Sequence, residues 1–175
     1  MPARTEVIVF GGGCFWCTEA VFKLFKGVVG TEPGYAGGTT PNPDYKLVCT
    51  GRTGHAEVLK IEYDPETVSL DRLLDVFFKM HDPTTKERQG ADVGTQYRSI
   101  ILYSHEAQKD AIQRAIERHR KDFGNPIVTE VKKLTAFYPA EDYHKDYYDH
   151  NRFQPYCAIV IGPKIKKIKK EFGLE

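Results

Sequence analysis

The sequence predicts an α+β fold, a mixed sheet with helices packed on it, in a single domain of residues 1–175. The 175 residues are 41% hydrophobic, with a mean hydropathy of −0.47, which suits one soluble domain with enough apolar mass for a core. Strand-like and helix-like segments alternate, and no low-complexity linker or internal repeat separates them. Their order mixes crossovers with neighbouring strands, which favours helices that cover a sheet.

Strands are expected where apolar and β-branched residues form short runs between turn-forming residues. The first run, 6–10, is mostly apolar, which is typical of a strand in the middle of a sheet. The same criteria predict further strands at residues 28–35, 55–63, 98–103 and 129–134, and a short one at 158–161.

Helices are expected where apolar residues recur at helical spacing between start and stop signals. The predicted helices are 18–25, 70–80, 106–123 and 163–172. Ser69 is placed to cap the second helix, and Gly124 to end the third. The last helix carries its lysines on a solvated outer face, because Ile165, Ile168 and Phe172 would face inward.

The segment 33–54 is long and rich in turn-forming residues. Loops of more than ~12 residues in compact domains are often functional, so this segment is a candidate for part of a site. A plain surface insertion would have the same composition.

The charges of the chain are balanced, with 25 lysines and arginines against 24 aspartates and glutamates. A balanced chain has no global field to attract a nucleic acid or an anionic membrane, so neither partner is expected. The N-terminal apolar run is shorter than a signal peptide requires, and no run of ~18 apolar residues could span a bilayer. We therefore expect a cytoplasmic protein that acts as a monomer.

The stretch "VIVFGGGCFWC" places Cys14 where a strand turns through three glycines into a helix. A thiol in the first turn of a helix meets unpaired backbone N–H groups and the positive end of the helix dipole. Both stabilise a thiolate and can lower the thiol pKa below its free value of ~8.5. The setting predicts a nucleophile, and the glycines leave room for a reactant.

Other interpretations of these cysteines stay open. In a reducing compartment the chain's four cysteines are not expected to form structural bridges. A glycine-rich turn can bind phosphate, but "GGGCFWC" lacks the spacing of either common nucleotide-binding motif. A C-x-x-C pair can hold zinc, but no second pair follows it. Cys14 and Cys17 could form a thioredoxin-like dithiol, and Cys17 and Cys49 could be inert buried thiols.

Glu57 is the candidate proton donor. If residues 55–63 form a strand, period two places Glu57 on the same face as Leu59 and Ile61. A carboxyl on an apolar face is desolvated, which raises its pKa and suits it to act as a general acid near neutral pH. The alternative is that Glu57 lies at the end of the strand and reaches solvent.

Six blocks of the chain resemble, in the family's order, the A class of peptide methionine sulfoxide reductases. The blocks are "GGGCFWC", "PDYKLVCTGRTGHAEV", "HDPTT", "DVGTQYRS", "FYPAEDYHKDYY" and "PYC". The resemblance implies a ferredoxin-like sheet with helices packed on it. It also implies a thiol reductase that needs no cofactor and returns the S epimer of methionine sulfoxide, free or in proteins, to methionine.

The resemblance implies a role for each matching residue. Cys14 would attack the sulfoxide sulfur while Glu57 protonates its oxygen. Tyr45 and Tyr97 would donate hydrogen bonds to that oxygen, where charge develops. Asp92 would support the site through polar contacts.

The remaining roles concern the substrate pocket and the second thiol. Phe15 and Trp16 would enclose the S-methyl group. Cys14 would be left as a sulfenic acid, which a second thiol converts to a disulfide that thioredoxin or a similar dithiol reduces. Cys17 stands where many members have glycine and is one candidate for that thiol, and Cys157, which matches a C-terminal resolving cysteine, is slightly favoured. Cys49 is interpreted as structural.

A different class of function competes with this one. A thioredoxin-like dithiol–disulfide oxidoreductase would use Cys14 and Cys17 without a small-molecule substrate. Such a protein would not need an acid and two tyrosines around its thiol, so the surroundings of Glu57 discriminate between the two. A regulatory sulfoxide binder without turnover would lack the nucleophile that Cys14 provides.

Overall fold

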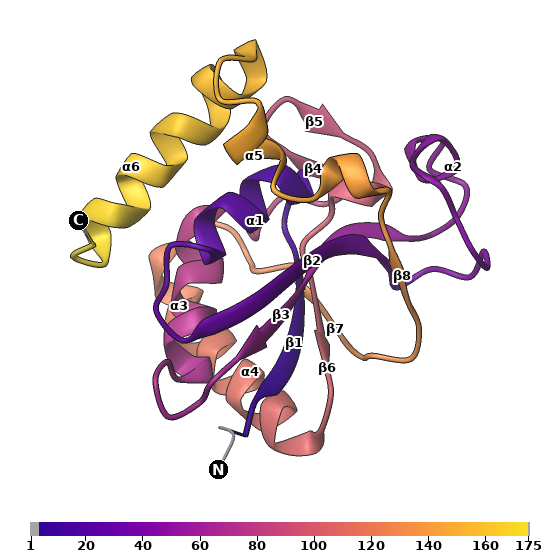
Figure 1. Ribbon diagram of the computed structural model, residues 1–175. Coiled ribbons are helices and arrows are strands. Elements are labelled where there is room, and N and C mark those ends of the chain that lie inside the picture. Colours follow the sequence, from indigo (N-terminus) through magenta and orange to yellow (C-terminus); the bar gives the residue numbers. More distant parts are fainter. Residues whose placement is uncertain (1–3, 175) are drawn as a thin grey trace.

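The computed structural model describes residues 4–174, so residues 1–3 and 175 of the expected domain lie outside the described part. A six-stranded sheet runs through the molecule in the order β7-β6-β1-β3-β2-β8 (Figure 1). Its strands are β1 Glu6–Gly11, β2 Val28–Ala36, β3 Ala56–Tyr63, β6 Ile100–Tyr103, β7 Glu130–Lys133 and β8 Phe137–Pro139. The α-helices are α1 Phe15–Phe22, α2 Tyr45–Cys49, α3 Leu70–Met80, α4 Glu106–His119, α5 Tyr147–His150 and α6 Gly162–Glu171. A separate two-stranded ladder pairs β4 Arg88–Gln89 with β5 Asp92–Val93.

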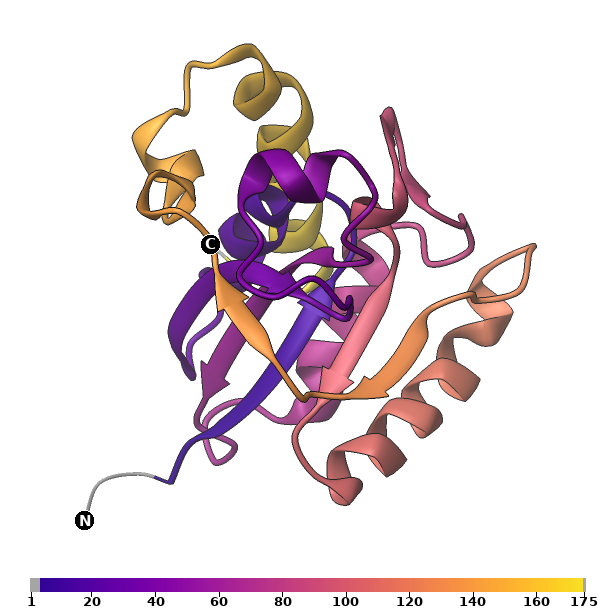
Figure 2. The ribbon, with the colours of Figure 1, turned by 90° about the vertical axis from the view of Figure 1, so that its right-hand side faces the viewer.

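The centre of the sheet has the ferredoxin-like arrangement. Its elements follow the order β1-α1-β2-β3-α3-β6, and neighbouring strands in this centre are antiparallel. The predicted fold class is therefore confirmed. β7 adds a parallel strand beside β6, and β8 adds an antiparallel strand beside β2. The chain crosses one face of the sheet between these two edges (Figure 2), where Leu134 and Phe137 pack on buried aliphatic residues of the strands.

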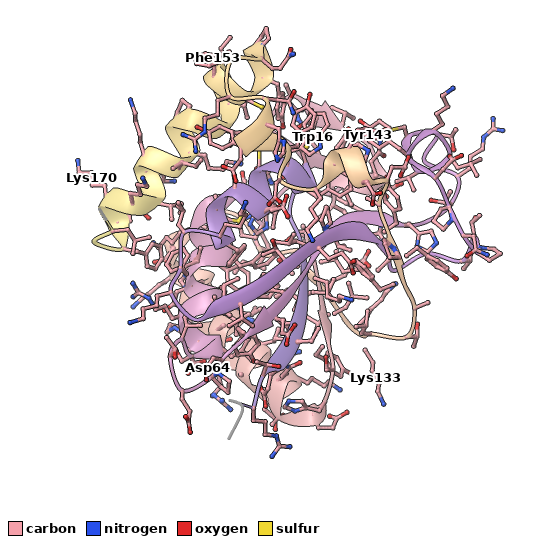
Figure 3. All side chains as sticks on the ribbon, in the orientation of Figure 1. Trp16, Asp64, Lys133, Tyr143, Phe153 and Lys170 are labelled. Carbon is pink, nitrogen blue, oxygen red and sulfur yellow. The ribbon has the colours of Figure 1, made fainter. Side chains whose placement is uncertain are left out.

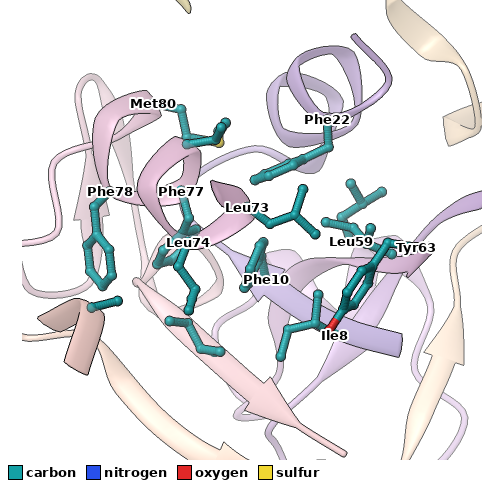
Figure 4. Close-up of a cluster of buried hydrophobic side chains, with 14 of the residues drawn as sticks. Ile8, Phe10, Phe22, Leu59, Tyr63, Leu73, Leu74, Phe77, Phe78 and Met80 are labelled. Atoms are coloured by element: carbon teal, nitrogen blue, oxygen red, sulfur yellow. The ribbon is translucent and has the colours of Figure 1, made fainter. Parts of the chain in front are cut away.

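The main core lies between the other face of the sheet and helices α1, α3 and α4 (Figure 4). Strand side chains alternate between faces, so Ile8 and Phe10 of β1 point into this core together with Leu59 of β3. The ring of Phe10 stacks on that of Phe77 in α3, with centroids 4.8 Å apart. Each fully buried side chain of this size contributes roughly 1.5–3 kcal/mol, so this layer holds α1 and α3 on the sheet.

The helix predictions hold best where a capping residue marks the boundary. Helix α3 has the predicted bounds, and the Ser69 hydroxyl accepts a hydrogen bond from the Arg72 amide at 3.1 Å. Helix α1 starts earlier than expected, directly after Cys14, and ends at Phe22. Helix α4 ends at His119, and a 3-10 turn, Arg120–Asp122, carries the chain on toward Gly124. Helix α6 lies close to its predicted range.

The predicted short strand at 158–161 is wrong. Residues Cys157–Ile161 form a π-helix that continues directly into α6. Cys157 and Ile161 are buried, whereas Ile159 is 73% exposed and Val160 39% exposed. Burial therefore follows a helical spacing of four, and packing of this segment outweighs the strand propensity of its β-branched residues.

The segment 33–54 is ordered by contacts at its base. Strand β2 continues to Ala36, and α2 forms further on. The Arg98 guanidinium donates to the carbonyl groups of Gly37, at 3.5 Å, and Gly54, at 2.9 Å, which close the two ends of the loop. The His55 ring accepts from the Gly38 amide at 3.0 Å and contacts the Thr40 carbonyl at 2.7 Å. These contacts at the base of the loop therefore fix the position of α2.

Within residues 4–174, no helix has both the length and the apolar content needed to cross a membrane.

Candidate active site

The glycine turn between β1 and α1 sets the position of Cys14. Gly13 has a φ of +92°, a conformation that side-chain-bearing residues rarely adopt. A Cβ on Gly12 would lie 2.8 Å from the His81 ring, so only glycine fits there. Cys14 is the N-cap of α1, with φ −65° and ψ 131°, and is 9% exposed. The predicted placement of this thiol at a helix N-terminus is confirmed.

The protonation of Cys14 differs from the sequence-based expectation. Burial raises the pKa of the thiol well above its usual range, and the Glu57 carboxylate raises it further. The Trp16 amide at the start of the helix acts in the opposite direction, as a helix N-terminus should. The expectation of a lowered pKa is therefore wrong, because desolvation and a facing carboxyl outweigh the helix terminus in this closed site.

Glu57 lies where strand periodicity predicted. It is 1% exposed on β3, on the face that also buries Leu59 and Ile61. Burial raises its pKa to about 8, although the Phe15 amide, which donates to Oε1 at 3.2 Å, lowers it. Its Oε2 atom is buried and has no hydrogen-bond partner among residues 4–174. Glu57 is thus a carboxyl that is largely protonated at neutral pH and has an oxygen available to a ligand.

Two tyrosines face this carboxyl from different elements. Tyr45 is the first residue of α2, and Tyr97 ends the 3-10 helix Thr95–Tyr97. Burial and then Glu57 raise the pKa of both phenols, so each remains a neutral hydrogen-bond donor. Asp92, in β5, accepts a hydrogen bond from the Tyr156 hydroxyl at 2.9 Å. The structure brings these sequence-predicted residues together.

Aromatic side chains form one wall of the site. Phe15 is 1% exposed, and its ring centroid lies 4.9 Å from that of His144. Trp16 stacks on Tyr147 with centroids 3.7 Å apart, and its Nε1 donates to His144 Nδ1 at 3.0 Å. Trp16 and Tyr143, which both pack on His144, lie at the same end of the molecule (Figure 3). Ring packing and one side-chain hydrogen bond therefore hold the aromatic rings of this wall together.

Sequence reasoning assigned no role to several residues that complete the site. Glu141 accepts from the Tyr35 hydroxyl at 3.0 Å and from the Tyr45 amide at 3.1 Å, so it holds α2 against the sheet. Tyr35 lies directly opposite Glu57 in the β2–β3 register. The other residues of this kind are His144, Tyr147 and Tyr156. Most of them fall in the block "FYPAEDYHKDYY", which was noted as a motif but has no periodicity that reveals their contacts.

The structure gathers three of the four thiols in one apolar cluster. Cys14, Cys17 and Cys157 are all buried in it, and all four cysteines are free. Cys14 and Cys17 also line a cavity of about 100 Å³. Cys49 is exposed at the end of α2, so its interpretation as a structural thiol is wrong, and its sulfur lies beside the Tyr45 hydroxyl.

The site places a sulfur nucleophile beside a protonated carboxyl, with further thiols in the same cluster. This arrangement is expected of a cysteine-dependent oxidoreductase. Comparison with known proteins narrows the class. Residues 6–174 match the family described as "Peptide methionine sulfoxide reductase", and the chain belongs to that family of enzymes, which reduce methionine sulfoxide.

Individual relatives are similar along most of their length. The peptide methionine sulfoxide reductase MsrA of Sulfolobus acidocaldarius is 56% identical over 167 residues, which cover 95% of each chain. Among solved structures, reduced Mxr1 of Saccharomyces cerevisiae has a TM-score of 0.84 at 38% identity, over 90% of this chain and 91% of Mxr1. Mxr1 in complex with Trx2 has a TM-score of 0.60 at 27% identity, over 84% of this chain and 87% of Mxr1.

Proposed function

We propose that this enzyme reduces the S epimer of methionine sulfoxide, free or in oxidised proteins, through a Cys14 sulfenic acid. The observation that carries the proposal is the buried Glu57 carboxyl with its unpartnered Oε2 atom. Its pKa of about 8 keeps it largely protonated at neutral pH, beside the thiol that must attack. A protonated carboxyl with an open oxygen is suited to donate a proton to the oxygen of a bound sulfoxide.

The first step joins the Cys14 sulfur to the sulfoxide sulfur while Glu57 protonates the sulfoxide oxygen. The hydroxyl group then moves to the Cys14 sulfur, and methionine leaves. The substrate sulfur gains two electrons and the Cys14 sulfur loses two, so Cys14 ends as a sulfenic acid. Because the thiol proton returns to the Glu57 carboxylate, the acid is restored within the step.

The other residues of the site stabilise this step. Tyr45 and Tyr97 donate hydrogen bonds to the sulfoxide oxygen as negative charge develops on it. Phe15 and Trp16 form the apolar surface for the S-methyl group, whose attached sulfur is polarizable. Asp92 supports the site through its contact with Tyr156.

The sulfenic acid is then removed by a second thiol, Cys17 or Cys157, which forms a disulfide and releases water. An external dithiol protein, thioredoxin, reduces that disulfide, as the solved complex of the similar protein Mxr1 with Trx2 supports. A reducing cytoplasm is the matching location, which the four free cysteines support. The family match over residues 6–174 supports action as one domain.

The test is a reaction of reduced protein with excess racemic methionine sulfoxide without any reductant. We expect about one methionine per chain, from the S epimer alone, because each chain has one such nucleophile and no means of regeneration. Release of no methionine would leave the dithiol shuttle as the better account of Cys14 and Cys17.

A further inference from the structure

We propose that Cys17 is the thiol that attacks the Cys14 sulfenic acid, and that Tyr156 and Asp92 carry away its proton. The proposal rests on the proposed function, because a sulfenic acid forms only if Cys14 reduces the sulfoxide. It assigns a chemical task to Cys17 and to the half-buried phenol of Tyr156, which takes no part in the hydrogen bond between Trp16 and His144.

The position of Cys17 favours it over Cys157. Cys17 and Cys14 line the same small cavity, whereas Cys157 packs in the surrounding apolar cluster without lining that cavity. The Cys17 amide donates to the Cys14 carbonyl at 3.1 Å, so the two residues are fixed one helical turn apart. Cys17 is also close enough to Cys14 to contribute to the raised pKa of the Cys14 thiol, after burial and Glu57.

Only a small movement is needed to join these two sulfurs. Residues three apart on a helix have Cβ atoms about 5–6 Å apart, and a disulfide needs about 3.5–4.5 Å. Cys14 is the N-cap, and its extended backbone lies outside the helix. Its side chain can therefore turn toward Cys17 while the hydrogen bonds of α1 beyond the first turn stay in place.

A proton path leads away from Cys17. Its Sγ lies 3.7 Å from the Tyr156 hydroxyl, which donates to Asp92 Oδ2 at 2.9 Å. Because the single phenol proton is directed at Asp92, the phenol oxygen can accept the Cys17 S–H. A shift of both protons leaves a Cys17 thiolate that accepts a hydrogen bond from Tyr156, and a protonated Asp92. Burial raises the pKa of Tyr156, so the phenol passes a proton on and does not ionise.

The charges around Cys17 explain why such a path is needed. Burial raises the pKa of the Cys17 thiol, and Asp92 and Cys157 add smaller increases. Lys164 of α6, which lines the same cavity, and the Tyr156 hydroxyl lower it. Since burial prevails, few Cys17 thiols would ionise unaided at neutral pH, and a nearby base speeds the step. The Lys164 ammonium then stabilises the thiolate while it exists.

Formation of the disulfide between Cys14 and Cys17 releases one water molecule. The Cys17 thiolate attacks the Cys14 sulfur, an S–S bond forms and the S–O bond breaks. The departing hydroxide takes the proton held by Asp92 and leaves as water. The Cys14 sulfur is reduced from the sulfenic to the disulfide state and the Cys17 sulfur is oxidised to it, so no outside oxidant is required.

Peptide mapping identifies the first disulfide. Trypsin releases Cys14 and Cys17 together in peptide 5–23 and Cys157 in peptide 153–164. After one turnover, quenched early, we expect an internal disulfide within 5–23 in the parent and in Cys157→Ser. Cys17→Ser should still release about one methionine per chain but accumulate a sulfenic acid that dimedone traps. A first disulfide that links the two peptides, in the parent and equally fast in Cys17→Ser, would overturn the proposal.

Kinetics test the proton path separately. In Tyr156→Phe the ring remains but the relay is lost, so we expect disulfide formation to slow about 10²-fold at neutral pH, well beyond any change in the rate of methionine release recorded in the same reaction. The gap should narrow as pH rises, because hydroxide then removes the Cys17 proton. Tyr148→Phe, which deletes a nearby phenol oxygen outside the path, is the control. Equal disulfide-forming rates in Tyr156→Phe and the parent at every pH would refute the relay.

The two levels of failure can be told apart. If no methionine is released by the parent, the proposed function fails and the later step cannot be observed. If the parent releases methionine but Cys17→Ser and Tyr156→Phe form a disulfide as fast as the parent does, only the roles assigned to Cys17 and its proton path fail.

Discussion

At the scale of single residues, Glu57 carries most of the chemistry. Replacing Glu57 with glutamine keeps the side-chain shape but removes the transferable proton. We expect methionine release in a single turnover to slow by roughly 10²–10⁴-fold at neutral pH, the usual contribution of a positioned general acid. Glu62→Gln, an exposed change on the same strand, should leave the rate unaltered. Methionine release by Glu57→Gln as fast as by the parent would exclude the acid role.

The raised pKa of Glu57 also predicts a pH dependence. The acid form is required, and with a pKa of about 8 it predominates below that pH and disappears above it. The single-turnover rate of methionine release should therefore fall as pH rises through about 8, approaching about tenfold for each further unit. Rapid-quench measurements between neutral and alkaline pH check this. A rate that keeps rising through this range would mean that thiol ionisation, and not the acid, limits the step.

Residue roles differ in how far the sequence can reveal them. Glu57 could be predicted because strand periodicity is local, and its apolar neighbours on β3 mark the buried face. The bond from Trp16 to His144 joins residues 128 positions apart, and no local pattern encodes it. The pKa of Cys14 was mispredicted for a related reason. Helix position is visible in the sequence, whereas the burial that dominates the pKa depends on the assembled fold.

At the scale of elements, the loop that carries α2 depends on Arg98. The Arg98 Nη2 atom donates to both Gly37 and Gly54, while Nη1 donates to the Thr95 carbonyl and Nε to Glu130. Lysine has a single nitrogen and no planar guanidinium, so it cannot keep all of these contacts at once. We expect Arg98→Lys to lower kcat/KM by about tenfold to 10²-fold, since small misplacements of positioning groups have effects of this size. Trypsin should also cut faster after Lys46 and Arg52 in the loop.

A matched control is Arg114→Lys, an exposed change on α4 that should alter neither activity nor cleavage. If Arg98→Lys is cut and reacts as the parent does, the base of the loop is held by other contacts, such as those of His55.

The elements show the same division between local and distant information. Helix α3 could be predicted closely because Ser69 and a strong apolar stripe define it within its own sequence. The π-helix before α6 was mistaken for a strand because Ile159 and Val160 favour strands locally. Only the burial of Cys157 and Ile161 against the rest of the fold reveals the helical spacing. The short strands β4, β5 and β8 are likewise too short to leave a pattern of their own.

At the scale of the whole molecule, His81 links stability to pH. Its buried ring contacts the Phe77 carbonyl through Nδ1 and the Ser99 hydroxyl through Nε2, and burial lowers its pKa from 6.5 to about 4. Between about pH 4 and pH 6.5, His81 therefore binds a proton in the unfolded chain but not in the folded chain. The stabilisation from neutral His81 is present above pH 6.5 and is lost as pH falls toward 4.

We expect this group alone to remove on the order of 3 kcal/mol of unfolding free energy across that interval. Urea denaturation at a series of pH values checks this, with His81→Gln losing the dependence and the exposed His150→Gln keeping it. An NMR titration of the His81 ring in the parent protein measures its pKa directly and needs no variant. A ring that becomes charged near pH 6.5 in the folded protein would contradict the expectation.

The core that holds α3 on the sheet has a consequence for survival under oxidants. The chain contains two methionines, and one of them, Met80, is 3% exposed within that core. Conversion of a core methionine to its polar sulfoxide disrupts packing, and burial shields Met80 from the agents that would cause it. An enzyme that repairs this lesion thus offers few targets for it. Peroxide should therefore oxidise the exposed Cys49 thiol, whose sulfenic state a reductant can reverse, before it reaches Met80.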